Sequence, residues 1–115
     1  KSFGVEVESA LTVLSTVTSR PTADRIICDA GFKATGNVSP DPELRNISDC
    51  ASIKFSAEHG IITLSKGTPQ PRVGDTIEFV PGYSDSAIFL HEYLYGVRDG
   101  LVETVWPVIG RGKLQ

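Results

Sequence analysis

The dipeptide Asp99-Gly100 constrains the fold more than any other feature of the sequence. It lies between two runs of strand-forming residues, 93–98 and 101–108, and the first run alternates regularly between the two faces of a strand. Both central residues of a type I′ turn have positive φ, and Asp followed by Gly is among the pairs that adopt this turn best. The sequence therefore predicts a C-terminal β-hairpin that turns at Asp99-Gly100.

Five earlier runs also predict strands. Some alternate apolar with polar residues, the period of a strand with one buried face, and others are rich in β-branched residues. They cover residues 11–17, 24–28, 51–55, 61–64 and 76–79. Segments 36–42 and 66–74 contain Gly and Pro and predict loops. Residues 41–48 are expected to hold one short helical turn.

These runs define the expected fold class. No window of about 12 residues or more shows the 3.6-residue apolar period of a helix. We therefore predict an all-β fold, a small distorted barrel or sandwich of about six to eight mostly antiparallel strands with a C-terminal hairpin. A chain of 115 residues forms one domain, residues 1–115, because two domains would each lack a sufficient core.

Charge and composition exclude several classes of partner. The net charge is −3 and no run of Lys or Arg forms a basic stripe, so neither nucleic acid nor an anionic membrane surface is an expected partner. No apolar stretch approaches the roughly 20 residues of a membrane-spanning helix. With no secretory signal and two cysteines, Cys28 and Cys50, that do not form a disulfide framework, we expect a cytoplasmic protein.

Two polar segments contain residue types that carry chemistry. Glu58-His59-Gly60 joins two predicted strands, and a carboxylate beside an imidazole serves proton transfer, although the same residues also suit a surface turn. Residues 81–86 follow a strand, and Asp85 within them suits either a metal ligand or a general base, or else a cap for the next element. None of the five lysines lies in an apolar context that would suit a Schiff base. They are Lys1, Lys33, Lys54, Lys66 and Lys113.

Eight short segments, in order along the chain, resemble the C-terminal part of D-threonine aldolases and D-serine dehydratases. The resemblance extends over residues 13 to 113. It includes Asp29-Ala30-Gly31, Glu58-His59-Gly60, Val73-Gly74-Asp75, Pro81-Gly82, Leu90-His91 and the segments around Arg20, Gly96 and Trp106. Because the segments keep the order of that family, the chain is identified as resembling it.

The resemblance implies a larger enzyme. Members of this family pair an alanine-racemase-like barrel, which holds pyridoxal phosphate on a lysine, with a β domain that contacts a second subunit. The chain opens at Lys1 and contains no methionine, so we expect the C-terminal domain of a longer enzyme whose cofactor-binding barrel is absent. The implied reaction is cleavage of a D-3-hydroxy amino acid, or elimination of water from D-serine, with a base at the 3-hydroxyl.

The resemblance also implies a divalent metal site at residues 81–85. The family motif resembles Pro-Gly-His-x-Asp, and here Asp85 aligns with a metal ligand while Tyr83 replaces the histidine. A phenol with a pKa of about 10 is a poor substitute for imidazole at neutral pH, so a metal held here should be a hard ion such as magnesium or manganese. His59 and Tyr83 are the expected catalytic residues.

Two functions remain open from the sequence. The first is the lid half of a pyridoxal-phosphate-dependent lyase, with His59, Tyr83 and Asp85 facing the cofactor of a partner barrel. The second is a non-catalytic assembly or dimerisation domain that retains a degenerate metal site. The replacement at Tyr83 favours the second, whereas the presence of Asp85, His59 and His91 favours the first.

Overall fold

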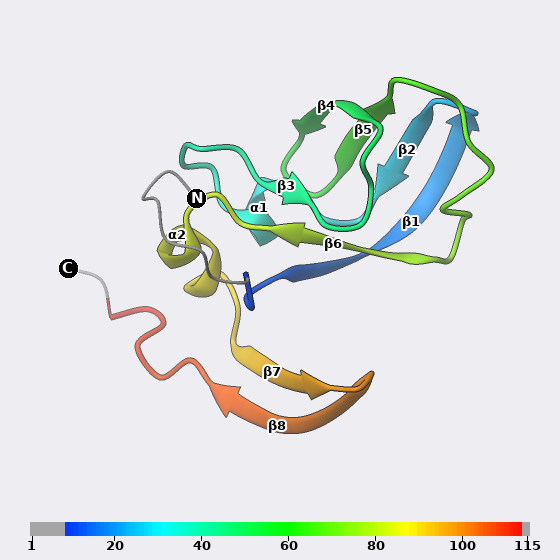
Figure 1. Cartoon of the computed structure of the whole chain (residues 1–115). Helices are drawn as coiled ribbons and strands as arrows, with labels where there is room; N and C mark the ends of the chain where they lie inside the picture. The colour runs from blue at the N-terminus through cyan, green and yellow to red at the C-terminus, as the bar shows by residue number, and fades with distance from the viewer. Residues whose placement is uncertain (1–8, 114–115) are drawn as a thin grey trace.

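The protein consists of a curled six-stranded sheet and a separate two-stranded hairpin (Figure 1). The computed structural model describes residues 9–113. All pairs are antiparallel, and the strand order of the large sheet is β3-β6-β1-β2-β5-β4. The elements are β1 (Val13–Thr22), β2 (Arg25–Cys28), α1 (Phe32–Thr35), β3 (Glu43–Leu44), β4 (Cys50–Phe55), β5 (Gly60–Leu64), β6 (Thr76–Val80), α2 (Ser84–Ile88), β7 (Tyr93–Arg98) and β8 (Leu101–Pro107).

Strand β1 is shared between the two halves of the large sheet. Its first residues, Val13 to Thr16, pair with β6, and its later part pairs with β2 from Val17 onward. Two register shifts, one on each side of Ser19, interrupt the pairing with β2. Such irregularities bend a strand and increase its twist, so the sheet curls into a nearly closed barrel rather than lying flat.

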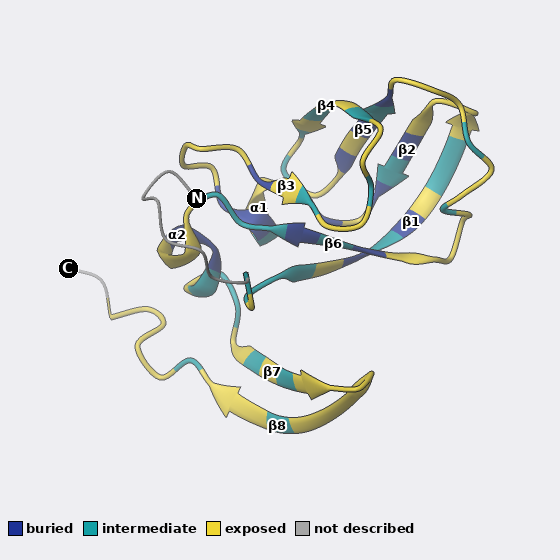
Figure 2. Cartoon of the chain, in the orientation of Figure 1, coloured by how far each residue is buried: buried dark blue, intermediate teal, exposed yellow. Residues whose placement is uncertain are grey.

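The curled sheet encloses one apolar core. Along β5 the buried residues alternate with more exposed ones, and β2 and β6 show the same period. The edge strands β3 and β4 pack against this core through partly buried side chains (Figure 2). The fully buried apolar side chains of the core include Val17, Ile26, Cys28, Ile62 and Phe79.

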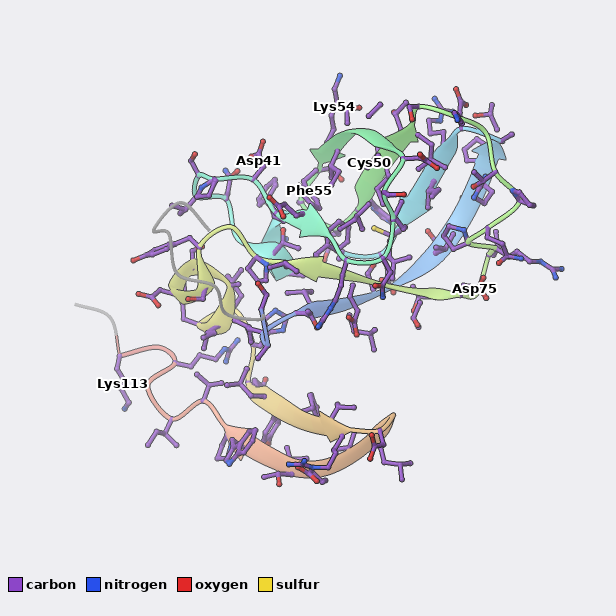
Figure 3. All side chains as sticks on the ribbon, viewed as in Figure 1. Asp41, Cys50, Lys54, Phe55, Asp75 and Lys113 are labelled. Atoms are coloured by element: carbon purple, nitrogen blue, oxygen red, sulfur yellow. The ribbon has the colours of Figure 1, made fainter. Side chains whose placement is uncertain are left out.

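Phe79 is the largest of the fully buried side chains. Its ring meets Phe55 of β4 edge to face, with centroids 5.5 Å apart, which is a favourable aromatic geometry. Figure 3 shows the alternation of β4 directly, because Lys54 projects away from the barrel while Phe55 lies on its inner side. Burial of a side chain of this size stabilises the fold by about 1.5–3 kcal/mol.

Arg20 fixes the long connection between β5 and β6. Its guanidinium donates hydrogen bonds to the backbone carbonyls of Pro71 at 2.8 Å, Ala23 at 2.6 Å and Thr68 at 2.5 Å. The five donors of a guanidinium suit such a cluster of acceptors. The predicted loop at 66–74 is therefore present, and an Arg of β1 attaches it to the barrel.

The predicted hairpin is confirmed, including its turn. Strands β7 and β8 pair antiparallel up to Arg98 and Leu101, with Asp99 and Gly100 between them. Both turn residues have positive φ, 52° at Asp99 and 79° at Gly100, as a type I′ turn requires. The all-β class, the number of strands and their antiparallel pairing are confirmed as well.

One local expectation is corrected. The helical turn expected within residues 41–48 is wrong: that segment holds the two-residue strand β3, and Asn46 beyond it adopts a φ of 67°, which no right-handed helix contains. The two helices lie elsewhere, at α1 and α2, and they have only four and five residues. Within residues 9–113, neither helix has the length and apolarity needed to cross a bilayer.

Replacing Gly100 with Val should destabilise the hairpin. A β-branched residue resists positive φ, so we expect Gly100→Val to lower the free energy of hairpin opening by about 1 kcal/mol or more. Hydrogen exchange of the β7 and β8 amides measures this locally. Gly110→Val is the matched control, because Gly110 is not among the positive-φ glycines and no atom lies within 4 Å of an added Cβ. Equal exchange in the two variants would contradict the type I′ assignment.

Candidate active-site loop

The structure brings Tyr83 and Asp85 together. Tyr83 precedes helix α2 with extended backbone angles, φ −134° and ψ 110°, and Asp85 lies in the first turn of the helix. The Tyr83 hydroxyl donates a hydrogen bond to the Asp85 carboxylate, with 3.1 Å between Oη and Oδ2. The two residue types singled out from the sequence therefore form one pair. Asp85 is on a helix, however, and not in an extended loop.

The proton in the hydrogen bond between Tyr83 and Asp85 belongs to the Tyr83 hydroxyl. The hydrogen bond to Asp85 raises the pKa of the Tyr83 phenol above its ordinary value, and the negative charge of the carboxylate raises it further. The phenol thus stays protonated at neutral pH and acts as a donor, whereas the carboxylate is the acceptor. Tyr83 is 47% exposed and Asp85 is exposed too, so a substrate or a partner domain can reach both.

Three interactions hold this loop in place. Gly82 passes so close to Pro40 that a Cβ would collide with the Pro40 carbonyl. The hydroxyl of Ser86 donates to the Tyr83 carbonyl at 2.9 Å. Beyond the helix, the Nε2 of His91 lies 2.8 Å from the carbonyl oxygen of Ala34 in α1, which identifies that ring nitrogen as the donor. The loop is therefore anchored on both sides of the Tyr83–Asp85 pair.

His59 occupies the turn between β4 and β5. Its backbone amide donates a hydrogen bond to the Ser56 hydroxyl, and its carbonyl accepts hydrogen bonds from the amide and hydroxyl of Ser56. These bonds close the turn. The first amides of α1, at Phe32 and Lys33, donate to the carbonyls of Ser56 and Ala57 at 2.9 and 3.0 Å. Helix α1 thus fixes the turn, and the imidazole of His59 is exposed.

Asp29 is the charged neighbour of His59. Its carboxylate accepts hydrogen bonds from the amide of Thr16 at 2.9 Å and the hydroxyl of Ser15 at 2.8 Å, both in β1. The Thr16 amide contributes most to lowering the pKa of Asp29, with smaller contributions from the Ser15 hydroxyl and the charge of His59, and together these outweigh the opposing effect of burial. No role was predicted for Asp29 from the sequence, although it belongs to the Asp29-Ala30-Gly31 segment of the resemblance.

The sequence-predicted residues thus fall into two groups. One is the Tyr83–Asp85 pair before and within α2, and the other is His59 with Asp29. Helix α1 connects them, because its N-terminal amides bind the His59 turn and its Ala34 carbonyl binds His91. The backbone of His59 is hydrogen-bonded to Ser56, and its charge acts on Asp29 through space.

The described residues do not fit a complete metal or cofactor site. Across residues 9–113, no three or more His, Cys, Asp or Glu side chains gather in a way that would hold a metal ion. Four lysines are exposed and lack the apolar surroundings of a Schiff-base lysine: Lys33, Lys54, Lys66 and Lys113. Lys1 lies outside the described residues.

A separate hollow of about 660 Å³ lies beside β6, away from α2. Its lining is mixed, from Ile77 and Leu64 to Asp75 and Glu78. The guanidinium of Arg45 in this hollow already faces the carboxylate of Glu78 at 3.6 Å. The only cation among its described lining residues is therefore already paired, and none of the site residues predicted from the sequence lines this hollow.

Comparison with known proteins decides the family. The family model described as "Putative serine dehydratase domain" matches residues 10–97. The chain belongs to this family. It is 36% identical over 105 residues to the D-threonine aldolase of an Arthrobacter species, and 40% identical over 108 residues to the 3-hydroxy-D-aspartate aldolase of Paracoccus denitrificans. These matches cover 91% and 94% of the chain.

A solved structure shows the same fold. The crystal structure of D-threonine aldolase from Filomicrobium marinum superposes with a TM-score of 0.89 at 29% identity, over 96% of this chain and 30% of that one. The chain spans only 28% and 27% of the two aldolases above. An uncharacterized protein of Mycobacterium tuberculosis, 29% identical over 113 residues, is instead covered over 85% of its length. The chain thus spans most of this relative's length, in contrast to the aldolases.

Asp85→Asn should lower the pKa of the Tyr83 phenol. The substitution removes the negative charge that disfavours the phenolate and weakens the acceptor of its proton. We expect the Tyr83 resonance in a pH titration by NMR to shift its midpoint to lower pH. Glu92→Gln, an exposed carboxylate just beyond α2, is the charge-matched control. A titration of Tyr83 that is unchanged in Asp85→Asn would show that the hydrogen bond does not form in solution.

Asp29→Asn should flatten the dependence of stability on acid pH. Because the pKa of folded Asp29 lies below its ordinary 3.8, its carboxylate stabilises the fold above that pH, and the stabilisation is lost as pH falls through the folded value. Unfolding free energies measured from pH 5 downward should therefore fall less steeply in Asp29→Asn. Ser15→Ala removes one of the donors and should raise the folded pKa part of the way. Parallel pH profiles for wild type and Asp29→Asn would refute this account.

Proposed function

We propose that this chain is the C-terminal β domain, residues 1–115, of a longer pyridoxal-phosphate-dependent lyase that acts on small D-3-hydroxy amino acids. The observation that carries the proposal is the match of more than nine-tenths of the chain to two aldolases of which it spans less than one-third. The rest of such an enzyme holds the cofactor, which supplies an electron sink when bound. This chain contributes side chains to the active site and contacts to a second subunit.

The Tyr83–Asp85 pair is the part of this chain best suited to that chemistry. Cleavage of a 3-hydroxy amino acid requires a base that takes the proton of the 3-hydroxyl. Asp85 is an exposed carboxylate that already accepts a hydrogen bond from the Tyr83 hydroxyl. It is therefore the proposed acceptor of the 3-hydroxyl proton. Tyr83, whose phenol stays protonated, is the proposed acid, which donates to a developing negative charge. His59 is the third proposed catalytic residue, held beside Asp29 at the other end of α1.

Asp85 is also the ligand that this loop would offer to a divalent metal. Catalytic zinc sites usually have three protein ligands, and the described residues gather no group of three or more candidate ligand side chains. The isolated chain should therefore bind metal weakly. A metal site at this loop would require further ligands from the rest of the enzyme.

One observation favours the second function, an assembly domain without catalysis. The mycobacterial relative is covered over 85% of its length by this chain, so the domain is also found in a chain without room for a cofactor barrel. In that case the exposed surfaces would bind a separate partner, and Tyr83 and Asp85 would have no catalytic effect. The two functions differ in what the same substitutions do to the rate.

The test is lyase activity of the longer protein on D-threonine, D-3-hydroxyaspartate and D-serine, with and without a chelator. If Asp85 is the proton acceptor, Asp85→Asn should reduce kcat/KM by about 10²–10⁴-fold, the range of general acid–base contributions, without changing the melting temperature. Tyr83→Phe should reduce it as well, and Glu92→Gln should not. Full activity of Asp85→Asn would support the assembly function instead.

Metal titration into the isolated chain gives an independent measurement. Tyr83→His restores an imidazole beside Asp85, so calorimetry with zinc and manganese should show the variant binding about ten-fold or more tighter than wild type, which is about 1.4 kcal/mol. Tight zinc binding by the wild type would mean that another ligand completes the site.

A further inference from the structure

The β7–β8 hairpin exposes apolar side chains on both of its faces. Cross-strand partners lie on one face, and the face of Tyr95 and Val105 also carries the pairs Tyr93–Pro107 and Val97–Val102. Of these six side chains, the five other than Pro107 are each exposed by about half or more. Figure 2 shows the hairpin almost entirely exposed, in contrast to the barrel above it.

The opposite face is apolar as well. The indole of Trp106 lies across Gly96, since a Cβ at Gly96 would meet the indole ring at 2.9 Å. Trp106 is nevertheless 53% exposed, and Leu101 near the turn is 72% exposed. Beyond β8, Ile109 is 84% exposed. Aromatic residues on this scale are typical of the centres of protein interfaces, where an apolar body and a polar tip are both satisfied.

An isolated hairpin of this kind lacks a source of stability. Two strands alone are marginally stable in water, and a third strand or a packed element is needed to bury one face. Among the described residues, the extensive contacts of β7 are with β8. No strand of the six-stranded sheet pairs with either strand of the hairpin in this part of the chain. The exposed apolar surface of the hairpin is therefore expected to be covered by something outside residues 9–113.

The topology indicates where that covering part would enter. Val13, at the start of β1, pairs with Phe79 near the end of β6. From Val80 the chain continues through α2 directly into β7. Any segment that leads into β1 therefore arrives at the same end of the barrel from which α2 and the hairpin leave. In the aldolase relatives more than two-thirds of the polypeptide lies outside the matched part.

We infer that the β7–β8 hairpin is the surface on which the larger, preceding part of the longer polypeptide packs. The inference rests on the proposed function, in which this chain is the C-terminal domain of such a polypeptide. The part of the polypeptide that packs on the hairpin must present an apolar surface. It must also offer hydrogen-bond acceptors for the hydroxyls of Tyr93 and Tyr95 and the indole N–H of Trp106. The hairpin then positions α2, because only residues 89–92 separate the helix from β7.

Photo-cross-linking in the longer polypeptide tests this inference. A benzophenone amino acid in place of Tyr95, which is 61% exposed, is a conservative aromatic probe. Val73 in the β5–β6 connection is 59% exposed and serves as the matched control for a probe outside the hairpin. The protein is assembled from a mixture of light and heavy isotope-labelled chains, so that mass spectrometry separates cross-links within one chain from those between chains.

We expect the Tyr95 probe to capture peptides that precede residue 1 in the same chain, with several-fold higher yield than the Val73 probe. Light–heavy products would show that a second copy covers the hairpin, and equal low yields from both probes would show that nothing covers it. Either result overturns the inference. If the intrachain product forms but the protein has no lyase activity, the proposed reaction fails while the inferred interface stands.

Discussion

The double pairing of β1 is the constraint on which the rest of the structure depends. One strand bonds β6 through its first residues and β2 through its later ones, and the register shifts around Ser19 allow the change of direction. Without this bend the four-stranded and three-stranded portions would form a flat sheet with one open face. The bend instead closes them around Phe79 and Ile62, so a chain of this length obtains a core with few large side chains.

The same strand also positions polar groups at the end of the barrel. Ser15 and Thr16 of β1 hold the Asp29 carboxylate immediately after β2 ends, and the segment that follows forms α1. Helix α1 has a single turn, yet its two ends bind different parts of the candidate site. Its N-terminal amides hold the turn of His59, and its Ala34 carbonyl holds His91 behind the Tyr83 loop. A displacement of α1 would therefore be felt at both groups.

Sequence patterns predicted the strands well because the two-residue period and the turn chemistry act locally. Asp99-Gly100 is the clearest case, since its positive φ values follow from the two residue types alone. The end of β1 was placed too early, at residue 17, because Arg20 and Pro21 do not read as a strand. Pro21 is tolerated there by the register shift between Ser19 and Thr22. Helices of one turn show no period at all, so α1 and α2 were not predicted. The grouping of Tyr83 with Asp85 was anticipated from the family resemblance of their segment, whereas the position of the His59 turn depends on how it packs against α1.

Within residues 9–113, the outer edges of β7 and β8 pair with no other strand. Unlike the two apolar faces, these edges are protected against association. A free strand edge is a template for pairing with strands of other molecules. Near the turn, the register shift between Gly96 and Val97 places Glu103 outside the regular ladder, where it accepts from the Arg98 guanidinium at 3.0 Å. Such a bulge twists the ribbon, and a charged pair on it must be desolvated before a neighbouring strand can add. The hairpin thus offers its side chains for recognition while its backbone resists edge-to-edge aggregation.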